Sequence, residues 1–232
     1  MALIGLIGPM EEEVAALKNK MHISGVLKKA SMEFYKGTLQ GKPVVVVRSG
    51  IGKVNAGLCT QILVDVFDVK MVINTGIAGS LDAKIDIGVI VISTEALQHD
   101  MDATQFGYPL GQIPRMETFA FPADETMVKV AKEACEKVNP EIHAFTGRIV
   151  TGDQFVASSE IKDRIKENFD GLCTEMEGAA IAQAAWLNKV PFVIIRAISD
   201  KADNSAEMDY PTFEKQAILH SVRLTEEMIR KL

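Results

Sequence analysis

Carboxylate side chains stand at three separate points of the chain, each beside glycine or other small and apolar residues. The segments are GPMEEEV (8–14), LCTEMEG (172–178) and RAISD (196–200). Acids can act as proton donor and proton acceptor in one site when their surroundings give them different pKa values. The two oxygens of a carboxylate can also accept hydrogen bonds from the neighbouring hydroxyl groups of a sugar. These residue types therefore favour acid–base catalysis on a hydroxyl-bearing ligand.

Each of these acids also has an ordinary structural explanation. The acids at 11–13 suit the first turn of a helix, where exposed N–H groups favour negative charge, and so do Glu175 and Glu177. Asp200 could close a turn after a strand. However, Arg196 lies within the same apolar strand, and a guanidinium is costly to bury without an acid partner. A buried arginine beside a carboxylate such as that of Asp200 would indicate a tuned functional site.

The elements that must position these acids alternate along the chain as short apolar runs and amphipathic helical runs. Runs such as VVVV, VIVI and FVIIRAI are continuous rather than alternating, which is typical of strands covered on both faces. The sequence therefore predicts one three-layer α/β/α domain over residues 1–232. In such sheets, ligands bind beyond the carboxyl ends of the strands, where the acids and glycines of this chain gather.

The patterns predict these elements by residue range. We expect strands at 2–7, 70–76, 89–93, 144–153, 172–176 and 192–199, a hairpin at 32–50 that turns near Gln40-Gly41, and helices at 10–21, 53–67, 123–138, 158–169, 177–189 and 211–232. The segment 94–121 is long, irregular and rich in glycine, proline and aromatic residues, so we expect it to be functional or interfacial.

Composition excludes several classes of protein. The 232 residues carry a net charge of −6, which argues against a general nucleic-acid or anionic-membrane surface. The three cysteines are odd in number and form no C-x-x-C pair, so we expect no disulfide framework or zinc site, and a reducing cytoplasm fits. The apolar run at the N-terminus is too short for a signal peptide or a membrane span.

Other motifs are weaker. SGIGKV (49–54) lacks the Ser or Thr and the upstream glycine of a phosphate-binding loop, and the dinucleotide pattern also fails. His99, Asp100 and Asp102 could bind a metal, but no second histidine lies nearby, and structural hydrogen bonding explains them better. We therefore expect no metal and no cofactor. Met10 and Met176 would ordinarily be core residues, yet beside these acids they could hold a flat base and a sugar.

Seven motifs that occur in order along the whole chain carry a resemblance to a known family. They are GPMEEEV (8–14), SGIGKVNA (49–56), INTGIAGS (73–80), QHDMDATQFGYPLGQIP (98–114), TGDQFV (151–156), TEMEGAAIA (174–182) and RAISDKAD (196–203). Together they resemble the bacterial 5′-methylthioadenosine/S-adenosylhomocysteine nucleosidases of the nucleoside phosphorylase/hydrolase superfamily. The resemblance implies a central twisted mixed sheet and hydrolysis of the bond between adenine and a 5′-thio-substituted ribose.

Motif by motif, the resemblance implies residue roles. Glu13 resembles the general base that orients water, Asp200 resembles the general acid that protonates adenine N7, and Glu177 resembles the ligand of the ribose hydroxyls. The substrate-binding residues that it implies are Met10, Ile51, Ile77, Phe155, Val156, Met176, Ser199 and Tyr210, together with Phe106 and Pro114 from the second subunit of a homodimer.

One departure and several alternatives stay open. Some relatives carry serine where this chain has Ile77, so a polar contact near the sugar could be lost. A purine nucleoside phosphorylase would need arginines for phosphate, whereas the first loop offers three glutamates. A hydrolase of 6-amino-6-deoxyfutalosine would differ only in the pocket for the 5′ substituent. A non-catalytic nucleoside-binding protein would hold the same ligand without consuming it.

Overall fold

The computed structural model covers residues 1–232 and describes the side chains of residues 1–206 and 212–232. Its strands are β1 (Ile4–Gly8), β2 (His22–Lys29), β3 (Met32–Leu39), β4 (Lys42–Arg48), β5 (Met71–Ser80), β6 (Ile90–Gln98), β7 (Phe121–Pro122), β8 (Ala144–Thr151), β9 (Cys173–Glu175) and β10 (Phe192–Asp200). Its helices are α1 (Glu11–Lys20), α2 (Lys53–Phe67), the 3-10 helix η1 (Thr104–Phe106), α3 (Glu125–Val138), α4 (Ser159–Phe169), α5 (Gly178–Leu187) and α6 (Ala206–Lys231).

The strands form one mixed sheet, and part of it closes on itself. β4, β1, β5 and β10 lie side by side and parallel, and the antiparallel strands β3 and β2 extend the sheet beyond β4. On its other side, β10 pairs antiparallel with β6. β6 pairs in parallel with β8, and β8 pairs in parallel with β9. β9 then pairs antiparallel with β5. β5, β10, β6, β8 and β9 therefore make a ring. This confirms the predicted α/β class with a mixed sheet.

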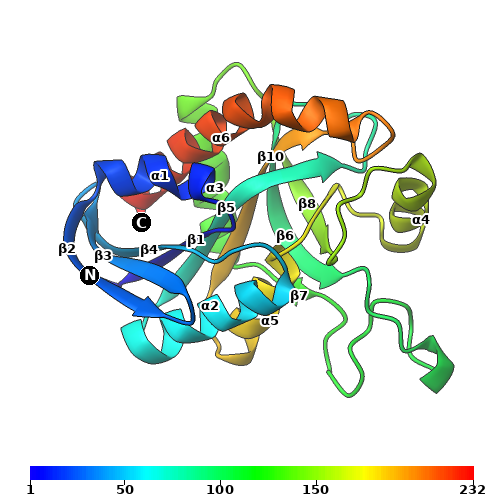
Figure 1. Cartoon of the computed structure of the whole chain (residues 1–232), viewed down its shortest axis with the longest axis horizontal. Coiled ribbons are helices and arrows are strands. Elements are labelled where there is room, and N and C mark those ends of the chain that lie inside the picture. Colours follow the sequence, from blue (N-terminus) through cyan, green and yellow to red (C-terminus); the bar gives the residue numbers. More distant parts are fainter.

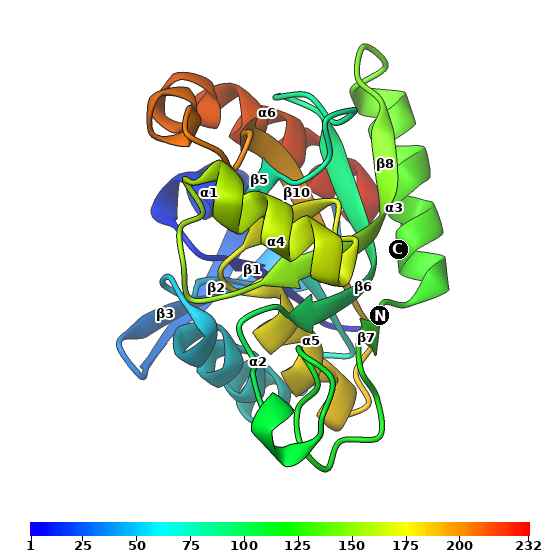
Figure 2. The ribbon, with the colours of Figure 1, turned by 90° about the vertical axis from the view of Figure 1, so that its right-hand side faces the viewer.

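Helices cover both faces of the sheet, as the continuous apolar strands require. Figure 1 shows α1 and α6 on one side and α2 and α5 on the other. Residues of α1, α3 and α6 pack in one core with side chains from one face of the sheet. Residues of α2 and α5 pack in a second core with side chains from the other face. A third, smaller core lies under α4, which stands before the ring in Figure 2.

The predicted hairpin turn is confirmed. Gln40 and Gly41 both have positive φ, at 51° and 78°, which is the conformation of a two-residue turn whose twist matches its strands. Strand β2 was not predicted because all eight of its residues are exposed, so it carries no apolar run. It forms by pairing with β3 at the edge of the sheet.

Three elements extend several residues beyond their predicted ends. β5 continues past residue 76 to Ser80. β6 continues past residue 93 to Gln98, because its second half pairs with β8. The last helix begins at Ala206 rather than 211. The carboxylate of Asp203 stabilises the turn before it by accepting the N–H and the hydroxyl of Ser205, at 2.9 and 2.8 Å. No helix among the described residues is both long and apolar enough to span a membrane.

Candidate active site

A cavity of about 400 Å³ lies where the ring meets the parallel half of the sheet. Its volume is in the range of small-molecule sites. The predicted residues that line it are Met10, Glu13, Ile51, Ile77, Phe155, Val156, Met176, Glu177, Ser199 and Asp200. It is also lined by Pro9, Ala78, Gly79, Gln154, Thr174 and Glu175. Segments that are far apart in the chain thus meet around one nucleoside-sized space.

The strands reach this cavity from two directions, which the sequence did not predict. β1, β4, β5 and β10 are parallel, so their carboxyl ends meet at one edge, as expected. β9 is antiparallel to β5, and β8 runs with β9. The residues after β8 and β9 therefore approach the cavity against the direction of the other strands. The ring closure makes this meeting possible.

Glu13 enters the cavity from the first turn of α1. Its side chain is buried, and its carboxylate accepts the N–H of Met10 at 2.7 Å and the N–H of Ile77 at 3.2 Å. These two donors fix the carboxylate between α1 and β5. Burial raises the pKa of Glu13 to about 7, although the two N–H groups and Arg196 pull it down. Glu13 can therefore exchange a proton near neutral pH.

Glu177 stands at the start of α5. Its carboxylate accepts the N–H of Gly52 at 2.8 Å, which ties α5 to the loop before α2. Burial, and then the charge of neighbouring Glu175, raise the pKa of Glu177 to about 8. The carboxylate is 4% exposed and borders the cavity, so it can accept hydrogen bonds from hydroxyl groups of a ligand there.

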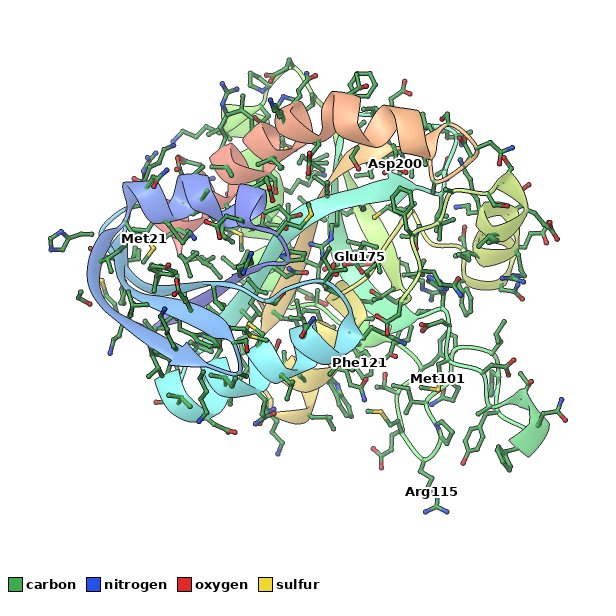
Figure 3. The ribbon with its side chains drawn as sticks, in the orientation of Figure 1. Met21, Met101, Arg115, Phe121, Glu175 and Asp200 are labelled. Carbon is green, nitrogen blue, oxygen red and sulfur yellow. The ribbon has the colours of Figure 1, made fainter. Side chains whose placement is uncertain are left out.

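Asp200 ends β10 on the opposite wall. One of its oxygens accepts the N–H of Ala202 at 2.8 Å, and the other accepts the hydroxyl of Ser199 at 2.9 Å. The residue is 2% exposed. Figure 3 shows Asp200 near the end of its strand, and Glu175 deeper in the molecule. Asp200 and Glu13 thus face one cavity from separate elements.

Arg196 is fully buried beneath these acids, and its partner corrects the prediction. Its guanidinium donates to Glu175 and to Asn74, each at 2.5 Å. Asp200 lies four residues further along the same strand, roughly 13 Å away at about 3.3 Å per residue, so Arg196 pairs with a different acid. The rise along the strand was the signal that could have excluded Asp200, because four residues separate the two side chains even though they would lie on the same face. Removing one member of a buried ion pair typically costs about 3–5 kcal/mol of stability.

Glu175 holds neighbouring groups in place, which agrees with the structural explanation offered for it from the sequence. It pairs with Arg196, accepts the hydroxyl of Thr151, and accepts the N–H groups of Glu177 and Gly178 at 3.1 and 2.8 Å. It therefore neutralises the buried arginine and caps the start of α5. Because α5 begins beside Glu177, this network also fixes the position of that acid.

Two glycines of β5 leave room for the acids. A Cβ atom on Gly76 would lie 2.9 Å from a carboxylate oxygen of Glu13, and one on Gly79 would lie 2.6 Å from a carboxylate oxygen of Asp200. Real Cβ atoms do not approach other atoms so closely. The pair of glycines in NTGIAG is therefore required by the carboxylates that pack against them.

Some predicted residues lie elsewhere. Phe106 is 83% exposed, and neither it nor Pro114 lines the cavity of its own chain. Tyr210 lies outside the described residues. All six cavity residues outside the predicted set lie inside the quoted motifs: Pro9, Ala78, Gly79, Gln154, Thr174 and Glu175. The small or unreactive side chains of Pro9, Ala78 and Gly79 gave no chemical signal.

The histidine of the QHDMD segment packs as a buried ring and does not make the side-chain hydrogen bond that was expected: its Nε2 has no hydrogen-bond partner among the described residues. His99 is 7% exposed and packs against Gly152, where a Cβ atom would meet its ring at 2.4 Å. Among the residues that the structure describes, no group of three or more His, Cys, Asp or Glu side chains is placed to hold a metal ion.

Comparison with known proteins decides the family. The model of the phosphorylase superfamily matches residues 3–230. A curated 5′-methylthioadenosine/S-adenosylhomocysteine nucleosidase of Staphylococcus carnosus is 43% identical over 231 residues, which is 99% of this chain and 100% of the relative. The chain belongs to this nucleosidase family.

Solved nucleosidase structures have the same fold throughout. The nucleosidase of Neisseria meningitidis in complex with methylthio-immucillin-A is 38% identical, with a TM-score of 0.96 and full coverage of both chains. The nucleosidase of Colwellia psychrerythraea in complex with adenine is 42% identical, with a TM-score of 0.95, covering 100% of this chain and 96% of the other. The nucleosidase fold therefore accounts for the whole chain.

Proposed function

We propose that this protein hydrolyses the N-glycosidic bond of 5′-methylthioadenosine and S-adenosylhomocysteine, and that Glu13, Glu177 and Asp200 carry the reaction. The products are adenine and the 5-thio-substituted ribose. The observation that carries the proposal is the convergence of these three buried carboxylates on one cavity of nucleoside size. The nucleosidase relatives and the adenine-bound structure support it. Residues 1–232 act as one catalytic domain.

The electrostatics of the cavity suit this reaction. Departure of adenine leaves positive charge on the sugar ring, in an oxocarbenium-like transition state. Preorganised negative groups stabilise such charge strongly when water is excluded. Glu13 and Glu177 are buried and border the space where the sugar would lie. In their ionised forms, these two side chains therefore lower the energy of the transition state more than that of the neutral substrate.

Glu13 is the proposed general base. The N–H groups of Met10 and Ile77 hold its carboxylate in place, and burial brings its pKa to about 7. A base with a pKa near the working pH can accept a proton from water as water attacks C1′. The proton moves from the attacking water to a carboxylate oxygen of Glu13.

Asp200 is the proposed general acid. It gives a proton to N7 of adenine as the glycosidic bond breaks, because adenine leaves poorly as an anion. Such acid groups typically contribute about 10²–10⁴-fold to the rate. Ser199 and the backbone of residue 202 hold the carboxyl group at the cavity wall.

Apolar residues hold the rest of the substrate. Phe155 is half exposed at the rim and can stack on adenine, while the backbone of buried Val156 reads the edge of the base. Met10, Met176 and Ile51 line the cavity. We expect the two methionines to border the ribose and the alkylthio group, and Ile51 to lie toward the 5′ substituent. Methionine and isoleucine suit a thioether better than a charged 5′ group.

Ile77 supplies its backbone rather than a hydroxyl. Its N–H donates to Glu13, and its side chain lines the cavity. The reaction proposed here requires no hydroxyl at this position, because Glu13 already has two hydrogen-bond donors.

Water rather than phosphate is the proposed nucleophile. Among the described residues that line the cavity, none carries a positively charged side chain. Arg196 is buried and already paired with Glu175. A phosphate anion would meet Glu13 and Glu177 without a cation to balance it, and like charges in a buried site repel strongly.

Product analysis tests the proposed function. Incubation with 5′-methylthioadenosine is expected to release adenine and 5-methylthioribose at the same rate with and without phosphate. Mass spectrometry identifies the sugar and chromatography measures the base. Formation of a sugar 1-phosphate would identify a phosphorylase, and binding without turnover would identify a nucleoside-binding protein. A parallel arm with 6-amino-6-deoxyfutalosine tests the sister hydrolase activity.

A homodimer is the second part of the proposal. The segment that carries Phe106 projects from the body of the chain in both views (Figures 1 and 2). Ile51, in the loop before α2, lines the cavity, and Val54 and Leu58 of α2 are also exposed apolar residues. We call these three residues the apolar row, in which Val54 is 73% exposed. We propose that this row meets a second copy, whose Phe106 and Pro114 then close the 5′ pocket.

Val54→Glu tests the dimer. A charge in an apolar interface is expected to shift the mass in light scattering from two chains to one and to raise KM for 5′-methylthioadenosine at least tenfold. Val26→Glu, on the exposed edge strand β2, is the control and should change neither. A dimeric V54E protein with unchanged KM would contradict the proposal.

The cytoplasm is the proposed compartment. Cys59, Cys135 and Cys173 are free and buried, which supports a reducing environment.

A further inference from the structure

A cluster of polar side chains lies behind the wall of the cavity and joins three loops. Lys53 donates from its ammonium group to Asp100 at 2.6 Å and to Gln98 at 3.1 Å. Asp100 accepts the N–H of Asp153 at 3.0 Å, and Asp153 accepts the N–H of Lys53 at 2.8 Å. Lys53, Asp100 and Asp153 therefore form a closed circuit of hydrogen bonds, which we call the clasp.

The clasp holds two loops that border the cavity. Lys53 follows Gly52, whose N–H binds the carboxylate of Glu177. Asp153 precedes Phe155 and Val156, which line the cavity where the base is proposed to bind. Neither Lys53 nor Asp100 lines the cavity itself, so the clasp acts on the ligand through its neighbours.

The adjacent backbone makes the turn at 151–154 a fixed platform. The N–H of His99 donates to the carbonyl of Thr151 at 2.8 Å, and the N–H of Gly152 donates to the carbonyl of Glu175 at 3.0 Å. The ring of His99 packs directly beneath Gly152. The backbone hydrogen bonds to the neighbouring strands therefore limit sideways movement of the turn. Its tilt depends on the hydrogen bond that the N–H of Asp153 donates to the carboxylate of Asp100.

The partial burial of the clasp gives it strength. The side chains of Lys53 and Asp100 are 18% and 19% exposed, so water screens this pair far less than an exposed one. Hydrogen bonds in which both partners are charged are shorter and stronger than neutral ones. Asp100 of the QHDMD motif therefore holds two loops together, rather than serving as a metal ligand.

We propose that Asp100 is a positioning residue that holds the base-binding turn and the Glu177-binding loop at their working separation. The inference rests on the proposed function, because the two loops matter together only if one ligand contacts both. Loss of the clasp leaves Glu13 and Asp200 in place, because neither contacts the clasp, and it loosens the grip on the base and, through Glu177, on the sugar. Substrate affinity should therefore suffer more than the chemical step.

Asp100→Asn and Lys53→Met test the proposal. Each is expected to raise KM for 5′-methylthioadenosine and Kd for adenine by roughly tenfold, the scale of one charge-assisted hydrogen bond, while kcat falls less than about threefold. The double variant should resemble either single variant, because both remove the same interaction. Adenine binding is measured by calorimetry, which does not depend on turnover.

Asp68→Asn is the matched control. Asp68 pairs with Lys70 at 2.5 Å on the exposed surface, at the other end of α2. This variant should change neither KM nor Kd. A role of Asp100 in stability alone would lower the melting temperature of D100N but leave KM and Kd per folded molecule unchanged, and that result would overturn the proposal. Additive penalties in the double variant would overturn it as well. If the wild-type protein binds adenine but releases none from the nucleoside, the proposed function fails, whereas the calorimetry still tests the clasp.

Discussion

Replacing Glu13 by Gln is expected to remove turnover and, at pH 8, to make the protein more stable. The pKa of Glu13 is about 7 in the fold and 4.5 in an ordinary setting, because burial disfavours its charge. The native state therefore binds the proton more tightly than the unfolded state does, and stability falls as pH rises from about 4.5 to 7. At pH 8 the ionised carboxylate costs about 3 kcal/mol at most. Gln carries no such charge.

Paired melting and activity measurements check this prediction. At pH 8 the melting temperature of E13Q should exceed that of the wild type by about 2–6 °C, since the amide loses part of the hydrogen bonding to Met10 and Ile77. The gain should vanish at pH 5, where Glu13 is protonated. Glu125→Gln, which changes an exposed acid in the first turn of α3, is the control and should change neither property. A less stable E13Q at pH 8 would contradict the raised pKa of Glu13, and an E13Q that retains turnover would contradict its role as general base.

The same pKa sets the pH dependence of the wild-type enzyme. A general base must be ionised, so kcat/KM should fall as pH drops below about 7, with a limb that belongs to Glu13. Glu177 has a raised pKa as well, and the two acids face the same cavity. The observed limb therefore reports the pair rather than one residue.

Asp200→Asn is the second variant with a large expected effect. Adenine release in a single turnover should slow by about 10²–10⁴-fold, because Asn cannot give a proton to N7. Binding of a non-hydrolysable nucleoside analogue should change less than about fivefold, since the amide keeps the hydrogen bonds to Ser199 and to the backbone of residue 202.

The control for this variant lies in the same loop. Asp203→Asn alters an acid that binds Ser205 and should leave the rate of adenine release close to that of the wild type. Rapid-quench measurements of adenine and calorimetry with the analogue separate chemistry from binding. Near-normal release by D200N would remove Asp200 from the mechanism.

Much of this site could be predicted from the sequence because its residues follow the ends of apolar strands. Gly8-Pro9-Met10, Thr174 to Glu177 and Ser199-Asp200 each come directly after such a run, and the structure brings all three to one cavity. Strand ends are visible in a sequence as the point where apolar residues stop. The ends of the apolar runs therefore predicted most of the residues that line the cavity.

Long-range pairing could not be predicted in the same way. The sequence does not show that β9 runs against β5, or that Arg196 meets Glu175 across the ring. Strand β2 has no apolar run and depends on its neighbour β3. The proposed contacts of Phe106 would be made with a second copy and so lie beyond any single chain. In each case the partner is remote in sequence, and the local pattern says nothing of it.

Gly76 and Gly79 make β5 a common backing for two acids with different tasks. A Cβ atom at either position would displace a carboxylate. The spacing of Gly76 and Gly79 along β5 therefore sets the distance between the proposed base and the proposed acid. Ile77 lies between them with its side chain on the cavity. A mutant library aimed at new nucleosides should therefore hold the two glycines constant and vary Ile77 and the residues of the rim. Variants of this protein can then accept different nucleosides while the distance between the proton donor and the proton acceptor stays the same.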